Sequence, residues 1–251
     1  MALRVEIVVA KYEESLKWLY LLPYPHTIYD KGPMSIAGAV SRPNVGREAE
    51  TWLHHIIDRY DSLADVTVFL QGHPLDHGGA HADPVSFSAH VVDCVRTAEK
   101  RGDVVPVNTI TTEDGWAFGL VVPLYYEHIF GVPQSPHKRY LFSPGAQYCV
   151  PRHNIHTRPK SFYKGLHRML VAETRESGGK EARQSFFEGR MCAWTIERLW
   201  MDIFNADTSV YSSIPSKLAI IPLLTLSSSM FAALLVVSYL CLFACLHYYM
   251  H

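Results

Sequence analysis

Six polar side chains that can ligate metals or take part in proton transfer lie in the segment QGHPLDHGGAHADP. They are Gln71, His73, Asp76, His77, His81 and Asp83. Imidazole and carboxylate groups bind divalent metals and act as general acids and bases. We expect His73 and Asp76 to bind a metal ion, and Asp76 and His77 to act in catalysis. The alternative is a polar surface loop without a function, because the segment contains no compact metal motif such as His-Glu-x-x-His.

Further candidates for substrate binding are charged residues that follow predicted strands or begin a predicted helix. They are Glu13, Asp30, Lys31, Arg47 and Arg152. Arg47, with the free N–H groups of a helix start, is suited to bind a phosphate. Arg152 begins a basic run, RHNIHTR, that is a second phosphate candidate. Each has a structural alternative: acids at a helix start, an N-cap with a surface ion pair, or a solvated loop.

One acidic residue lies in a largely apolar segment near residue 200. Glu197 occurs in WTIERLW, within a predicted helix. A carboxylate in such a place either pairs with a neighbouring cation, Arg198 or Arg190, or serves a site. We retain Glu197 as a catalytic candidate beside the structural interpretation.

The elements that must position these residues alternate between short apolar runs and amphipathic segments. We expect strands at residues 4–10, 26–29, 66–70 and 145–150, and helices at 13–20, 44–60, 85–101, 124–130, 159–176 and 182–205. The run VTVFL is apolar throughout, which is typical of a central parallel strand. In the helix 44–60, Asn44 is the expected N-cap and Trp52 lies on the apolar face.

This alternation predicts an α/β fold over residues 1–207, a mixed sheet with helices on both faces. Ligands of such sheets bind where the carboxyl ends of parallel strands meet the following loops. The rule predicts one cleft lined by Glu13, Asp30, Lys31, Arg47, His73, Asp76 and His77.

Composition narrows the class of protein. The 251 residues carry a formal net charge of -1, which argues against a dedicated nucleic-acid-binding protein. A small phosphorylated substrate remains compatible with this charge. The 5 cysteines include no Cys-x-x-Cys pair and do not resemble a disulfide framework, as expected of a protein in a reducing cytosol.

The most apolar part of the chain lies near its carboxyl end. Residues 218–246 contain no charged side chain, and an uncharged apolar run of 18 or more residues is a transmembrane-helix candidate. We expect a linker at 208–217, a membrane helix at 218–246 and a short tail at 247–251. No signal-peptide pattern precedes the first strand. These features predict a single-pass, C-terminally anchored membrane protein with its main domain in the cytosol. The alternative is a buried core helix.

Five blocks of the sequence resemble one uncharacterised-domain family, found largely in fungi with relatives in bacteria and plants. The blocks are VVAKYEESLKWL, IYDKG, PNVGREAETWLHHIIDRYDSLADVTVFLQGHP, SPGAQYCVPRHNI and ERLWMDIF. They contain the family's motifs N-V-G-R-E-A and V-F-L-Q-G. After the second motif the family tends to have Asp, whereas this chain has His73.

The order of these blocks also looks, more distantly, like the core of GT-A glycosyltransferases. That resemblance implies a GT-A-like transferase that uses a phosphate-activated donor, in fungal secondary-metabolite biosynthesis. It places His73 and Asp76 at the position of the Asp-x-Asp metal motif, with Mn²⁺ or Mg²⁺ as cofactor, and Glu197 at that of the general base. Two alternatives remain: another biosynthetic enzyme, such as a cyclase or condensing enzyme, and a non-catalytic membrane-bound scaffold.

Overall fold

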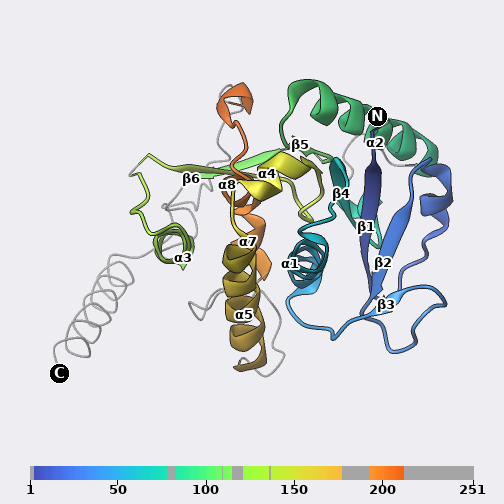
Figure 1. Cartoon of the computed structure of the whole chain (residues 1–251), viewed down its shortest axis with the longest axis horizontal. Coiled ribbons are helices and arrows are strands. Elements are labelled where there is room, and N and C mark those ends of the chain that lie inside the picture. The colour runs from blue at the N-terminus through green and yellow to red at the C-terminus, as the bar shows by residue number, and fades with distance from the viewer. Residues whose placement is uncertain are drawn as a thin grey trace, which may run out of the picture. The chain divides into compact units, whose positions relative to one another are not determined.

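The structure is a computed structural model that describes residues 3–77, 83–108, 110–114, 121–135, 137–176 and 193–211. These residues belong to one compact unit, Met1–Lys217. They form a mixed α/β fold, in which a six-stranded sheet carries helices on both faces (Figure 1). The predicted fold class is confirmed at this level.

The sheet has the strand order β3-β2-β1-β4-β8-β5. Its strands are β1 (Val5–Lys11), β2 (His26–Asp30), β3 (Val40–Ser41), β4 (Val66–Gln71), β5 (Val105–Pro106) and β8 (Tyr148–Pro151). Strands β3, β2, β1 and β4 run parallel to one another, whereas β8 runs antiparallel to both β4 and β5. The prediction that VTVFL forms an interior strand parallel to the first strand is confirmed. A separate antiparallel pair joins β6 (Thr111–Asp114) to β7 (Arg139–Phe142).

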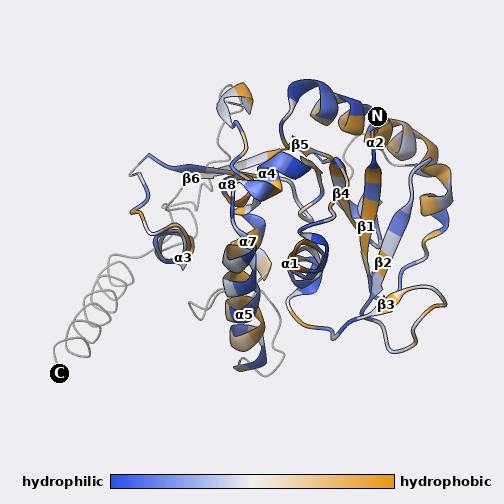
Figure 2. Ribbon diagram, in the orientation of Figure 1, coloured by the Kyte–Doolittle hydropathy of each residue, from blue (hydrophilic) through white to orange (hydrophobic). Residues whose placement is uncertain are grey.

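Two apolar cores cover the two faces of the sheet. Helices α1 (Arg47–Arg59), α5 (Lys160–Glu176), α7 (Ala193–Glu197) and α8 (Trp200–Ile203) contribute to one core, and helix α2 (Pro84–Arg101) with the 3-10 helix η1 (Lys17–Leu21) to the other. Successive side chains of a strand point to opposite faces, so Val8 enters the first core while Ile7 and Val9 enter the second. Figure 2 shows the resulting apolar β1 and β4 between helices with mixed surfaces.

The remaining elements connect these layers. They are the 3-10 helices η2 (Pro74–His77) and η3 (Ser209–Tyr211), and the helices α3 (Val121–Phe130) and α4 (Arg152–His156). Helix α3 extends the short helix expected at 124–130 toward the N-terminus. The 3-10 helix η3 lies in the first part of the segment expected to be a linker, and its Tyr211 packs against the first core.

Helix α1 begins later than its sequence suggests, and the prediction of Asn44 as its N-cap is wrong. The N-cap is Gly46, which has a left-handed backbone with φ of 60°, and Arg47 follows with φ of 49°. The Lys31 ammonium holds this turn, because its Nζ donates to the carbonyl oxygens of Val45 at 2.9 Å and Arg47 at 2.5 Å. A tertiary contact therefore decides where the helix starts.

Two predicted helices differ from the structure. Residues 13–20 do not form an α-helix; only Lys17–Leu21 is helical, as a 3-10 turn. The backbone N–H of Tyr12 donates to the Glu14 carboxylate, and the indole N–H of Trp18 donates to the Gly72 carbonyl. Neither of these hydrogen bonds belongs to a regular helix. In the predicted helix 182–205, residues 182–192 lie outside the described residues. The described remainder divides into α7 and α8.

The predicted membrane segment at 218–246 and tail at 247–251 also lie outside the described residues. Among the residues that the structure does describe, no helix is both long enough and apolar enough to cross a bilayer.

Candidate functional site

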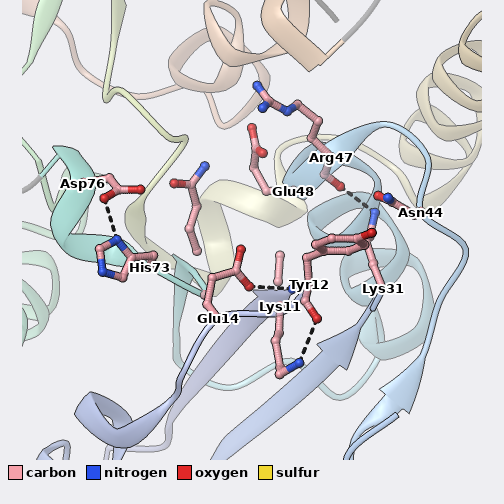
Figure 3. Close-up of a pocket in the computed structure, with 12 residues that line it drawn as sticks. Lys11, Tyr12, Glu14, Lys31, Asn44, Arg47, Glu48, His73 and Asp76 are labelled. Atoms are coloured by element: carbon pink, nitrogen blue, oxygen red, sulfur yellow. Dashed lines mark hydrogen bonds and ion pairs between the residues drawn. The ribbon is translucent and has the colours of Figure 1, made fainter. Parts of the chain in front are cut away.

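A polar pocket of about 440 Å³ opens at the carboxyl ends of β1, β2 and β4. Its lining comes from these strand ends, the start of α1 and the segment after β4: Ala10, Lys11, Tyr12, Glu14, Lys31, Asn44, Arg47, Glu48, Gln71, Gly72, His73 and Asp76. Figure 3 shows His73 and Asp76 on one side of the pocket and Arg47, from α1, on another. The strand order reverses between β1 and β4: β2 and β3 lie beyond β1, whereas β8 and β5 lie beyond β4. Ligands of α/β folds bind at such a reversal.

Close backbone packing forms the floor between β1 and β4. The Gly72 N–H donates to the Ala10 carbonyl at 2.8 Å. A Cβ atom added at Gly72 would lie 2.5 Å from the Glu14 carboxylate, and one added at Gly32 would lie 2.2 Å from the Tyr12 carbonyl. Real Cβ contacts are not this short, so Gly32 is required by the backbone of Tyr12, whereas a side chain at Gly72 would require the Glu14 carboxylate to move.

Asp30 lies beneath the pocket rather than in its lining. It is fully buried, its oxygens accept from the N–H groups of Gly32 and Ile36, and Lys11 Nζ lies 3.4 Å from each oxygen. Burial alone would raise its pKa, but the two N–H donors and the Lys11 charge together lower it. Asp30 is therefore an ionised structural anchor for the loop after β2.

Lys31 reaches the pocket wall, but its ammonium is bound inside the protein. Its Nζ lies 2.8 Å from the Glu50 carboxylate in addition to the two carbonyl oxygens described above. Glu50 is fully buried and also binds Arg42 and His167. Burial opposes ionisation of Glu50, yet the hydrogen bonds from His167, Lys31 and Arg42 lower its pKa to about 2. Because Lys31 has no donor left, its role is to support the loop that carries Arg47.

Arg47 is the pocket cation that is left to bind a ligand. Its side chain is exposed in the first turn of α1. Within the described part of the chain, its guanidinium has no hydrogen bond or ion pair. Guanidinium groups bind phosphates and carboxylates through paired N–H donors, so this side chain can bind an anion in the pocket.

Glu48 lines the same wall, and sequence analysis did not select it. It is partly buried, and burial together with the nearby Glu197 charge raises its pKa to about 7. Glu197 itself accepts from the Gly145 N–H at 2.7 Å and lies 3.6 Å from Arg198 Nη1. A carboxyl with a pKa near neutrality can donate or accept a proton at physiological pH.

His73 and Asp76 form a hydrogen-bonded pair at the pocket rim. His73 Nδ1 lies 2.5 Å from Asp76 Oδ1, and their side chains are 54% and 63% exposed. Gln147 at the base of this segment binds the Gln71 N–H and the Pro74 carbonyl, which fixes its path. In the described residues, no three His, Cys, Asp or Glu side chains are grouped to hold a metal ion. His73 and Asp76 supply two ligands at most.

The structure brings together four of the predicted site residues: Lys31, Arg47, His73 and Asp76. Glu13 is exposed and is not part of the lining, whereas its neighbour Glu14 is. The side chain of His77 lies outside the described part of the structure.

Arg152 does not reach this pocket. It follows β8, whose end pairs with the start of β4 because the two strands are antiparallel. Its guanidinium binds Asp65 at 2.7 Å, just before the start of β4, so it lies at the amino-terminal ends of the parallel strands, away from the pocket. Arg152, which the sequence offers as a separate phosphate candidate, therefore lies apart from the pocket residues: a parallel strand would have placed it at the pocket, and this antiparallel strand does not.

Residues 7–101 match the model of a family described as "Protein of unknown function (DUF3431)". The matched region spans less than half of the chain and contains α1, β4 and the pocket residues. A search of curated proteins found no match. The amino-terminal part of this chain, with its pocket, is thus similar to an uncharacterised family.

Proposed function

We propose that the pocket binds the phosphate-activated donor of a GT-A-like transferase, and that residues 218–246 attach this enzyme to a membrane. The observation that carries the proposal is Arg47, an exposed guanidinium that lines the pocket and has no partner in the described part of the chain. A phosphate held there would also lie near the N–H groups of the first turn of α1.

The position of the pocket in the sheet supports this proposal. The partial order β3-β2-β1-β4 is that of the first strands of doubly wound nucleotide-binding folds. In those folds the ligand lies beyond the carboxyl ends of the strands, at the place where strand order reverses. This is the place that Lys11, Gln71 and Arg47 occupy here.

The His73–Asp76 pair is suited to a divalent ion that completes its ligand shell elsewhere. Mg²⁺ in phosphate-transfer sites uses one or two carboxylates together with substrate phosphates and water, so Asp76 with an imidazole neighbour fits this pattern. When bound, Mg²⁺ or Mn²⁺ would neutralise charge on the diphosphate leaving group. Arg47 would bind the phosphate from the other side of the pocket. Asp76 would fix the orientation of that phosphate relative to β4.

The test is calorimetric titration of the full-length protein in detergent with a panel of nucleoside diphosphates, with and without Mn²⁺. Arg47→Gln should weaken binding about tenfold or more, the usual effect of losing a charge-assisted hydrogen bond. Arg59→Gln is the matched control, since it removes the same charge from the far end of α1, where Arg59 binds exposed Asp58. Equal binding by both variants would refute the proposal.

Asp76→Ala in the same titration tests the metal site. It should remove the Mn²⁺-dependent part of binding and leave the melting temperature nearly unchanged, because the side chain is largely exposed. The open His73–Asp76 pair, with no third ligand among the described residues, favours a scaffold without catalysis as the second candidate. Failure of every nucleoside diphosphate to bind would support that candidate.

A further inference from the structure

Tyr12 is the only residue with a large apolar ring among the described residues that line the pocket. It is 42% exposed, and Figure 3 shows it on the side of the pocket where Lys31 and Asn44 lie, with His73 and Asp76 on the other side. In the part of the chain that the structure describes, its ring makes no aromatic contact and its hydroxyl makes no hydrogen bond. An open ring of this kind in a polar pocket is a surface for a ligand.

The backbone of Tyr12 is fixed from three directions. Its N–H donates to the Glu14 carboxylate at 2.6 Å, and its carbonyl accepts from Lys11 Nζ at 2.8 Å. The loop after β2 passes so close that a Cβ atom at Gly32 would lie 2.2 Å from the same carbonyl oxygen. Because both backbone groups are occupied, the ring is what Tyr12 can offer to a ligand. A ring on a fixed backbone loses little freedom when a ligand binds.

Two side-chain amides, of Asn44 and Gln71, line the same pocket. Within the described residues, neither amide has a hydrogen bond. Each amide offers N–H donors and a carbonyl acceptor. A nucleobase matches this set, because its flat face stacks on aromatic rings and its edges carry donors and acceptors. An isoprenoid chain could cover the ring of Tyr12, but it would leave both amides facing hydrocarbon without a partner, which is unfavourable.

We propose that Tyr12 is the platform on which the base of a nucleoside diphosphate stacks, while Arg47 binds the phosphates of the same molecule. The inference rests on the proposed function and narrows its donor from any phosphate-activated compound to a nucleotide. A cavity of about 440 Å³ is within the range that holds ligands of this size. Every base has a π-face, so Tyr12 distinguishes nucleotides from other diphosphates rather than one base from another.

The experiment compares UDP and ADP with inorganic pyrophosphate, which has the phosphates but no base. Each is titrated calorimetrically into the full-length protein in detergent with Mg²⁺. Tyr12→Ala should weaken binding of both nucleotides about tenfold or more, the usual effect of losing a base–aromatic stack. Its affinity for pyrophosphate should stay within about twofold of the wild type, because both hydrogen bonds of Tyr12 involve backbone atoms that alanine keeps. Tyr12→Phe retains the ring and should bind UDP as the wild type does.

Tyr20→Ala is the matched control. Tyr20 is 85% exposed and is not part of the pocket lining, so this variant should bind all three compounds as the wild type does. A loss of nucleotide binding in Tyr20→Ala equal to that in Tyr12→Ala would overturn the assignment of the stack to Tyr12.

NMR of full-length protein labelled at the tyrosine ring carbons reports the stack directly. The Tyr12 resonances are identified by their loss in Tyr12→Phe. They should shift upfield when UDP or ADP is added, because of the ring current of the base, and should not shift in this way with pyrophosphate. The same response to pyrophosphate and to the nucleotides would overturn the proposal.

The remaining outcomes separate this inference from the proposed function. If Tyr12→Ala binds UDP as tightly as the wild type, or if Tyr12→Phe binds it as weakly as Tyr12→Ala, the stack is overturned. The anion site still stands in either case if Arg47→Gln loses both UDP and pyrophosphate.

Two results for the wild type would also overturn the inference. Binding of pyrophosphate but of neither nucleotide leaves only the anion site at Arg47. Tighter binding of geranyl diphosphate than of UDP identifies an apolar occupant instead of a base. If none of these compounds binds the wild type, the inference and the proposed function are refuted together.

Discussion

Lys31 and Glu50 form a buried ion pair in which the ammonium lies 2.8 Å from the carboxylate. The pair joins the end of β2 to α1, and the same ammonium binds the two carbonyl oxygens on either side of Gly46. The direction in which Arg47 leaves the start of α1 therefore depends on a charge pair that is itself hidden from solvent. Lys31 and Glu50 therefore support the pocket, whereas Arg47 is available to bind a ligand in it.

Lys31→Met should destabilise the fold by about 3–5 kcal/mol, because it leaves a buried carboxylate without one of its partners. Urea unfolding of the variant and wild type gives this difference. Asp93→Asn is the control: it breaks the Asp93–Arg96 pair, whose side chains are both about 70% exposed, and should cost less than about 1 kcal/mol. Similar losses in both variants would contradict the structural role of Lys31.

Acid should weaken the fold through Glu50. Its pKa is about 2 in the folded protein and lies near 4.5 when it is unperturbed. The unfolded chain therefore binds the proton first, and the stabilisation is complete above about pH 4.5 and is lost as the pH falls toward 2. The difference between wild type and Glu50→Gln, from urea unfolding at several pH values, should shrink by about 3 kcal/mol over this window. A constant difference would contradict the ionised state of Glu50.

Glu48 should have the opposite effect. Its pKa is raised from 4.5 to about 7 in the folded protein, so its contribution to stability is lost as the pH rises from about 4.5 through 7. Glu48→Gln should therefore be more stable than wild type at pH 8, by about 1–3 kcal/mol, and similar to it at pH 4. Denaturant unfolding at the two pH values provides the measurement. A less stable Glu48→Gln protein at pH 8 would show that the carboxylate is favoured.

Trp52→Ala should cost about 3–5 kcal/mol, the range for removing a large buried aromatic side chain. Trp52 is fully buried in α1, its ring lies 5.1 Å from that of Phe69, and its indole donates to the Ala146 carbonyl at 3.1 Å. Thermal or urea unfolding measures the loss. Trp52→Phe should cost less, since it keeps part of the contact with β4, and an alanine variant as stable as the phenylalanine variant would contradict this packing.

The membrane attachment is tested on cells that express the full chain. Carbonate extraction should leave the full-length protein in the membrane fraction, because residues 218–246 contain no charge. Deletion of residues 218–251 leaves the compact unit Met1–Lys217 intact and should release it from that fraction. Full-length protein in the carbonate supernatant would refute the anchor.

Much of the fold could be predicted from the sequence because its signals are local. The apolar run at 66–70 identifies an interior strand, and the apolar face of residues 44–60 identifies the helix that covers the sheet. Parallel strands bring their carboxyl ends to one edge, which is why Lys31, Arg47, His73 and Asp76 could be grouped in advance. Only residue type and periodicity were needed for these conclusions.

Tertiary structure decided which of these residues are available to a ligand. Lys31 and Asp30 are occupied by partners from other segments, and Arg152 lies at the opposite end of the strands because β8 is antiparallel. The pKa of Glu48 is raised by burial and by the charge of Glu197, 149 positions later in the chain. Burial and charge at these positions arise between segments far apart in sequence. A periodic pattern reports which face of an element is buried, but it carries no information about which distant charge will lie against that face.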